Sequence, residues 1–247
     1  MAESHGHSPL EQFTINPLVN LNAGGYSLDI TNSSLLMIIS AVFAIIFFLG
    51  ATRQRLIIPG RIQIAAESLY NFVESMLISN TGEGGRKFFP LVFSLFVFVL
   101  LCNLFGMMPY SFTATSHIIV TFALAAMLFV VIVIASFMKH GLKFLSIFLP
   151  SGAPGWMAPL LIVIELFAYL IRPFSLSIRL AANMTAGHTM LKVIASFVVS
   201  LGVLGGWFPL LFLVMLTGFE IFVAILQAYI FTMLACVYLN DAVELAH

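Results

Sequence analysis

The feature that most constrains the fold is the length of the apolar segments that carry no charge. Residues 30–52 contain no charged side chain, and residues 88–138 contain none with a permanent charge. A helix needs about 20 apolar residues to cross a hydrocarbon core of about 30 Å. Residues 30–52 are therefore predicted to form one span, and residues 88–138 are long enough for two. Because Gly106 and Pro109 interrupt the middle of the longer stretch, it is predicted to be a helical hairpin.

The composition also indicates a membrane protein. Of the 247 residues, 61% are hydrophobic and only 8% are charged, and the mean hydropathy is +1.10. So little polar surface would not cover a soluble globule of this size, and helices satisfy their own backbone polar groups in lipid. We therefore predict an all-α, polytopic membrane protein with five membrane-crossing helices. The formal net charge is zero and basic residues form no runs, so no nucleic-acid partner is expected.

A charged segment separates the first span from the hairpin. Within it, residues 56–80 have apolar side chains at helical spacing, and Glu67 and Glu74 are seven positions apart. This pattern is typical of an amphipathic helix that lies on a membrane surface.

The lysines and arginines predict the orientation of the chain. Residues 53–87 hold five of them and residues 139–143 hold two, whereas residues 1–52 hold none. Because positive residues favour the inner side, we expect residues 1–29 outside, and the amphipathic helix, the loop 139–158 and the carboxyl terminus inside. The loop contains the sequence FLPSGAPGWMAP, whose prolines and glycines exclude a regular helix.

Residues 159–245 are predicted to form a second helical hairpin, which turns at the sequence LGVLGGWFP. About 39 residues, or roughly 58 Å of helix, separate Glu165 from this turn, which is nearly twice the membrane thickness. The segment therefore either breaks at Pro173 or crosses the membrane at a steep tilt. We favour a steeply tilted helix that is kinked at Pro173, because the apolar pattern resumes directly after the proline.

Arg179 lies deep in this hairpin, although an arginine at bilayer depth costs about 3 kcal/mol. On a helical wheel it shares a polar face about 40° wide with Glu165, Arg172 and Asn183. His188 points to roughly the opposite face. The cation at position 179 therefore needs a partner or a water-filled cavity.

Folding the hairpin at its glycine turn places His188 and Glu220 at the same level, where they could share a proton. Gln227 then comes close to the level of Arg179. Glu165 lies about 21 Å from Arg179 along the helix axis and cannot neutralise it. The pattern predicts two offset half-paths for protons with Arg179 as the barrier between them, because a guanidinium does not relay protons.

Purely structural roles are the alternatives for these residues. Arg179 and Glu220 could form a buried ion pair, and His188 could serve only as an interhelical hydrogen-bond donor. Arg172 and Lys192 could extend along the helix to lipid phosphates.

The segments LIRPFSLSIRLAANMTAGH and FEIFVAILQAYIFTML closely resemble subunit a of the rotary F-type ATP synthases, and the resemblance covers nearly the whole chain. It implies that Arg179 is the essential arginine that faces a ring of c subunits, whose membrane carboxylate carries the proton. It also implies long, steeply tilted final helices. The resemblance further implies that Asn183 and Gln227 lie near Arg179. It assigns His188 and Glu220 to the outer half-channel and Glu165 to the inner half-channel.

The histidine and the acid occur in exchanged positions here. Many bacterial members of the family place an acid where this chain has His188 and a histidine where it has Glu220, and mitochondrial members show the arrangement found here. We expect the same relay role from the exchanged pair. Four further residues are candidates for the proton path: Asn103 and His117, which could instead join helices, and Arg172 and Ser175.

The resulting functional prediction is a non-catalytic proton-conducting stator subunit of a bacterial inner-membrane ATP synthase, with a mitochondrial inner membrane as the alternative. Its expected partners are the c-subunit ring, the peripheral-stalk b subunits, other synthase subunits and membrane lipid. No cofactor or metal is expected, because the chain has no P-loop or metal motif. The rival interpretation is a stand-alone proton-coupled secondary transporter in which Arg179 binds an anion. An intramembrane hydrolase would require a paired nucleophile and base, which the sequence lacks.

Overall fold

The computed structural model describes residues 17–19, 22–23, 26–27, 29–53, 59–108, 113–141 and 157–243. Nearly all of these residues are helical. The helices, in chain order, are α1 (Asn32–Arg53), α2 (Arg61–Thr81), η2 (Glu83–Phe88), α3 (Phe89–Gly106), η3 (Ala114–Ser116), α4 (Ile118–His140), α5 (Ala158–Ser200), α6 (Gly202–Gly205) and α7 (Trp207–Val243). Five stretches of the described chain are long and apolar enough to cross a membrane: α1, η2 with α3, α4, α5 and α7. The predicted all-α, five-span fold is confirmed.

Short strands precede α1, and all of them except β4 fall within residues 1–29, which are predicted to lie outside the membrane. β1 (Pro17–Val19) pairs with β4 (Ile30–Thr31), and β2 (Asn22–Ala23) pairs with β3 (Tyr26–Ser27), both antiparallel. These strands were not among the elements predicted from the sequence. They lead into α1 without changing the helical class of the membrane part.

The helix α2 lies between the first span and the first hairpin. Val73 and Leu77 on one side of it are fully buried in the core. Its Glu74 accepts a hydrogen bond of 2.8 Å from Arg86 in η2, which ties the two helices together. The predicted amphipathic helix 56–80 therefore corresponds to α2, which begins at Arg61. Residues 54–58 lie outside the described chain, as does most of the predicted loop 139–158.

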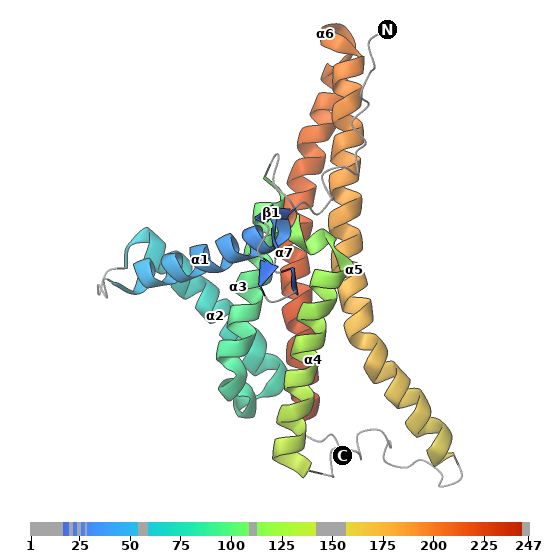
Figure 1. The fold of residues 1–247 in the computed structure, drawn as a ribbon. Helices are drawn as coiled ribbons and strands as arrows, with labels where there is room; N and C mark the ends of the chain where they lie inside the picture. Colours follow the sequence, from blue (N-terminus) through green and yellow to red (C-terminus); the bar gives the residue numbers. More distant parts are fainter. Residues whose placement is uncertain are drawn as a thin grey trace.

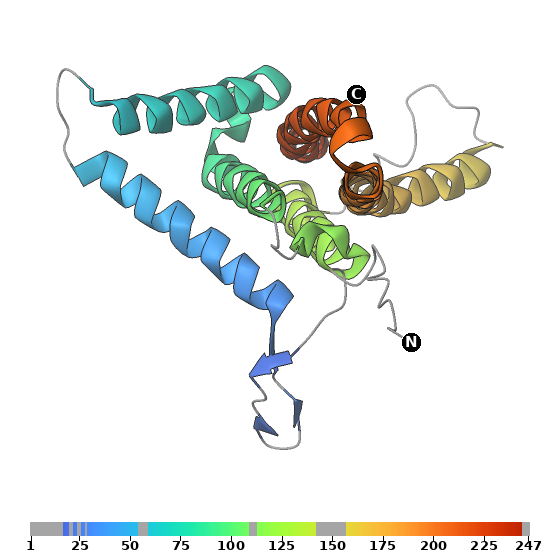
Figure 2. The ribbon, with the colours of Figure 1, turned by 90° about the horizontal axis from the view of Figure 1, so that it is seen from above.

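The last two long helices exceed the thickness of a membrane. α5 has 43 residues and α7 has 37, so each is longer than about 50 Å. α1 has 22 residues, or about 33 Å, which matches the hydrocarbon core. Figure 1 shows α1 lying across the long axis of α7, and Figure 2 looks along α7 while α1 lies in the plane of the view. The long helices α5 and α7 thus run in a different direction from α1, and their steep tilt in the membrane stays a prediction.

Pro173 lies inside α5 and does not end it. The helix is continuous through the proline, and Figure 1 shows that it bends in its first half. Proline lacks the N–H that would bond to the carbonyl four residues earlier, and its ring crowds that turn, so we attribute the bend to Pro173. The predicted kinked helix is therefore observed, and the alternative of a broken helix is not.

The core is built around α7, which packs against α2, α3, α4 and α5. Ala224, Ala228 and Ala235 of α7 are fully buried. Small side chains at these positions let neighbouring helix backbones approach closely, which is how membrane helices gain packing contacts. The large side chain of Phe231 on the same helix is 1% exposed and belongs to the same core.

Candidate functional site

The helix α5 has two distinct faces in its middle section. Ser175, Arg179 and Asn183, spaced by four residues, are all exposed. The opposite face is buried and ends at His188, after apolar residues that are also spaced by four. Arg179 and His188 therefore lie on different faces of α5, as the helical wheel predicted. The cation and the histidine face different surroundings, although they lie on one helix.

Arg179 has no acidic partner among the residues that the structure describes. Its side chain lies on a surface with exposed apolar neighbours such as Ile178. The alternative of a buried Arg179–Glu220 ion pair is not observed, because Glu220 is 5% exposed and contacts the other face of α5. An unpaired guanidinium in lipid is costly, so this face is suited to a carboxylate from outside the chain.

His188 of α5 and Glu220 of α7 are brought together, as the level count predicted. The distance from Nε2 of the histidine to Oε1 of the glutamate is 3.8 Å, and both side chains are about nine-tenths buried. Neither carboxylate oxygen of Glu220 has a hydrogen-bond partner among the described residues. A buried carboxylate without partners is costly. The arrangement is suited to holding and releasing a proton rather than to strengthening the fold.

Gly187 makes room for the Glu220 carboxylate. A Cβ atom added at this glycine would lie 2.5 Å from Oε1 of Glu220 and 2.9 Å from its Cδ. Any larger residue at position 187 would displace the carboxyl group. The sequence analysis did not single out this glycine, although it directly precedes the predicted relay histidine.

Thr113 is a second residue that the sequence analysis missed. It lies just before η3, is 2% exposed, and its Oγ1 is 3.0 Å from Nε2 of His188. The same hydroxyl donates to the carbonyl of Gly106 at 3.2 Å. The turn that carries Thr113 is held against α5 because Thr185 donates a hydrogen bond of 3.3 Å to the Ser116 carbonyl. The run of hydroxyl residues in SFTATSH is the signal that could have pointed to this turn.

Gln227 and Asn103 are buried between helices, and His117 is half-buried at the start of α4. Gln227 lies on α7, seven residues beyond Glu220, and is 5% exposed. Asn103 of α3 donates a hydrogen bond of 3.1 Å to the carbonyl of Ala224 in α7. This contact favours the structural alternative for Asn103, because it joins two core helices.

Arg172 lies beside an acidic residue and two tyrosines. Its guanidinium lies 3.8 Å from Oε1 of Glu165, and both side chains are about one-third exposed. It also lies 5.4 Å from the ring centre of Tyr169 and 5.3 Å from that of Tyr238 on α7. Contacts of a cation with aromatic faces are attractive. Glu165, the candidate for the inner path, therefore has Arg172 and not Arg179 as its counter-ion.

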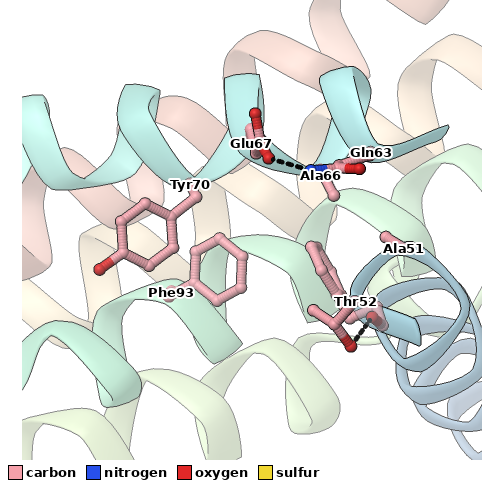
Figure 3. Close-up of a pocket in the computed structure, with 8 residues that line it drawn as sticks. Ala51, Thr52, Gln63, Ala66, Glu67, Tyr70 and Phe93 are labelled. Atoms are coloured by element: carbon pink, nitrogen blue, oxygen red, sulfur yellow. Dashed lines mark hydrogen bonds between the residues drawn. The ribbon is translucent and has the colours of Figure 1, made fainter. Parts of the chain in front are cut away.

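A hollow of about 290 Å³ lies elsewhere, between the carboxyl end of α1 and helices α2 and α3 (Figure 3). Its lining is mostly apolar, with Tyr70 and Phe93 on one side and Ala51 on another. Two of its polar residues, Gln63 and Glu67, are joined by a hydrogen bond of 2.8 Å. It shares no residue with the polar groups of α5 and α7. The described chain also contains no cluster of three or more residues suited to binding a metal.

The model of the family described as ATP synthase A chain matches residues 34–240, which cover the five candidate membrane helices except for the first two residues of α1.

Proposed function

Because the chain belongs to the ATP synthase A chain family, we propose that it forms two offset proton half-channels beside the ring of c subunits. Members of this family are membrane subunits of the synthase, and this chain is accordingly a proton-channel subunit of the stator. Proton flow through it would load and unload the ring carboxylates and so drive ATP synthesis elsewhere in the complex.

The observation that carries this proposal is the exposed position of Arg179. A fixed cation on the outer surface of a membrane helix, flanked one turn away on each side by Ser175 and Asn183, is suited to meeting an acidic side chain of another subunit. A ring carboxylate is such a group. It would be attracted to Arg179 when ionised and would move away into lipid when protonated.

The two half-channels would lie on either side of this cation. In the outer one, a proton passes to the buried pair of His188 and Glu220 and then to a ring carboxylate. After nearly one rotation of the ring it leaves by way of Glu165, which lies 14 residues before Arg179 on α5. Each elementary charge that crosses 100 mV releases about 2.3 kcal/mol, so several protons are needed for each ATP.

The proposed barrier role follows from the chemistry of arginine. A guanidinium keeps its proton, so it can attract a ring carboxylate without passing protons between the half-channels. The b subunits of the peripheral stalk would hold this chain against the ring. We place the complex in a bacterial inner membrane, with the amino terminus outside and the carboxyl terminus in the cytoplasm.

Arg179→Ala in the intact synthase tests the barrier role. In inverted membrane vesicles we expect loss of ATP-driven proton pumping, measured by quenching of an acridine dye, while the ring still co-purifies with the chain. Arg53→Ala, which removes an exposed arginine at the end of α1, is the matched control and should pump normally. Pumping by the Arg179→Ala complex at the control rate would contradict the proposal.

A further inference from the structure

Thr113 is held in a fixed position beside His188 and Glu220. Its side chain packs against Gly106, where an added Cβ would lie 2.9 Å from the threonine methyl group. Its hydroxyl lies between the Gly106 carbonyl, at 3.2 Å, and Nε2 of His188, at 3.0 Å. A buried hydroxyl with two partners on different helices has little freedom to rotate.

The number of hydrogen-bond donors at this site determines which ring nitrogen of His188 carries a hydrogen. A threonine hydroxyl has one proton to donate, and a backbone carbonyl can only accept. When Thr113 donates to Gly106, its oxygen is left to accept, so Nε2 of His188 must carry the hydrogen. That nitrogen is also the one 3.8 Å from Oε1 of Glu220. The hydroxyl thus selects the ring form of His188 whose N–H lies beside the glutamate.

The neighbouring Thr115 shows that burial alone does not produce this arrangement. It lies two residues away, is also fully buried, and its Oγ1 has no hydrogen-bond partner among the described residues. The two threonines are alike in size and burial, and they differ in contact with His188. Thr115 therefore offers a matched control.

We propose that Thr113 is a positioning residue for the outer proton path, which holds the His188 ring with its Nε2–H directed toward Thr113 and Glu220. This inference rests on the proposed relay role of His188 and Glu220. Without the hydroxyl, the ring loses a fixed acceptor and turns away from the orientation needed to exchange a proton with the glutamate. Positioning of this kind is effective because small changes in donor geometry strongly affect proton transfer.

The test compares Thr113→Val, Thr113→Ser and Thr115→Val in the intact synthase, with pumping expressed per assembled complex. Valine keeps the shape of threonine but removes the hydroxyl, and serine keeps the hydroxyl. We expect Thr113→Val to slow ATP-driven pumping by about tenfold, the effect of losing one hydrogen bond to a group that becomes charged. Thr113→Ser should stay within about twofold of the parent, and Thr115→Val should match it. Equal pumping by the two valine variants would overturn the inference.

A double variant separates positioning from a general packing defect. If Thr113 acts through His188, then Thr113→Val should slow pumping no further in a His188→Ala background, whereas independent packing effects would add. Should Thr113→Val reduce assembly, Thr113→Ala tests the same hydroxyl without steric demand, and normal pumping by it would also overturn the inference. Loss of pumping in Arg179→Ala with normal pumping in Thr113→Val would refute this inference alone. Normal pumping in Arg179→Ala would refute the proposed function instead.

Discussion

Gly187→Ala should slow proton transfer through the proposed outer half-channel without removing any of its polar groups. The added methyl carbon would lie 2.5 Å from Oε1, 2.9 Å from Cδ and 3.2 Å from Cγ of Glu220. Ordinary contacts need about 3.5 Å, so the carboxyl group must move by about 1 Å. His188 Nε2 is 3.8 Å from Oε1 before the change, so a movement of this size alters the pair substantially.

The expected loss follows from the cost of overpacking. Inserting one methyl group into a packed site typically costs about 1–3 kcal/mol, which corresponds to roughly a 5- to 160-fold change in rate if it acts on the transfer step. Because the glutamate side chain is flexible, we expect the complex to assemble normally. The energetic cost should instead slow proton transfer. We predict about tenfold slower ATP-driven proton pumping in inverted vesicles.

The control and the rescue make this prediction specific. Gly50→Ala in α1 adds the same methyl group where no atom lies within 4 Å, and it should pump normally. Adding Glu220→Asp to Gly187→Ala withdraws the carboxylate by one methylene and should restore part of the activity. The reasoning is refuted if Gly187→Ala pumps as well as Gly50→Ala, or if the double variant is slower than both single variants combined.

Other predictions address the remaining site residues. Exchanging the pair, with His188→Glu and Glu220→His together, should recover more pumping than either single change, whereas independent losses would argue against a shared relay. A cysteine at Asn183, on the exposed face of α5, should crosslink to a cysteine beside the ring carboxylate, and a cysteine at the buried Met184 should not. The reverse result would contradict the proposal that the exposed face of α5 is turned toward the ring. Asn103→Ala should lower the melting temperature of the purified complex, because it removes the bond to Ala224 and about 1–3 kcal/mol, while Ser94→Ala on the exposed side of α3 should not. Slower pumping by Asn103→Ala with unchanged stability would instead assign Asn103 to the proton path.

The sequence predicted the features that depend on helical period and length. The spans, the continuous bent α5, the two faces around Arg179 and the level match of His188 with Glu220 all follow from counting residues along a regular helix. The partner of Arg172 was also within reach, because Glu165 is seven residues earlier on the same face.

Contacts made by turns and by distant helices lay beyond such counting. Thr113 reaches His188 across 75 positions of sequence, and its place depends on how the turn between α3 and α4 packs against α5. Tyr238 meets Arg172 only because α7 returns beside the first part of α5. Helical periodicity carries no information about either contact, since both are set by tertiary packing.

The separation of Arg179 from Glu220 explains why one chain can hold both groups without pairing them. His188 is nine residues from Arg179, which is about 14 Å along the axis, and Glu220 lies at the level of the histidine. With an effective dielectric constant of about 20, attraction over 14 Å amounts to about 1 kcal/mol, against about 4 kcal/mol for a carboxylate 4 Å away. The difference of about 3 kcal/mol is close to the cost of exposing an arginine to lipid. A carboxylate that passes the exposed face of α5 would therefore compete successfully with Glu220 for Arg179, and the pairing would remain reversible.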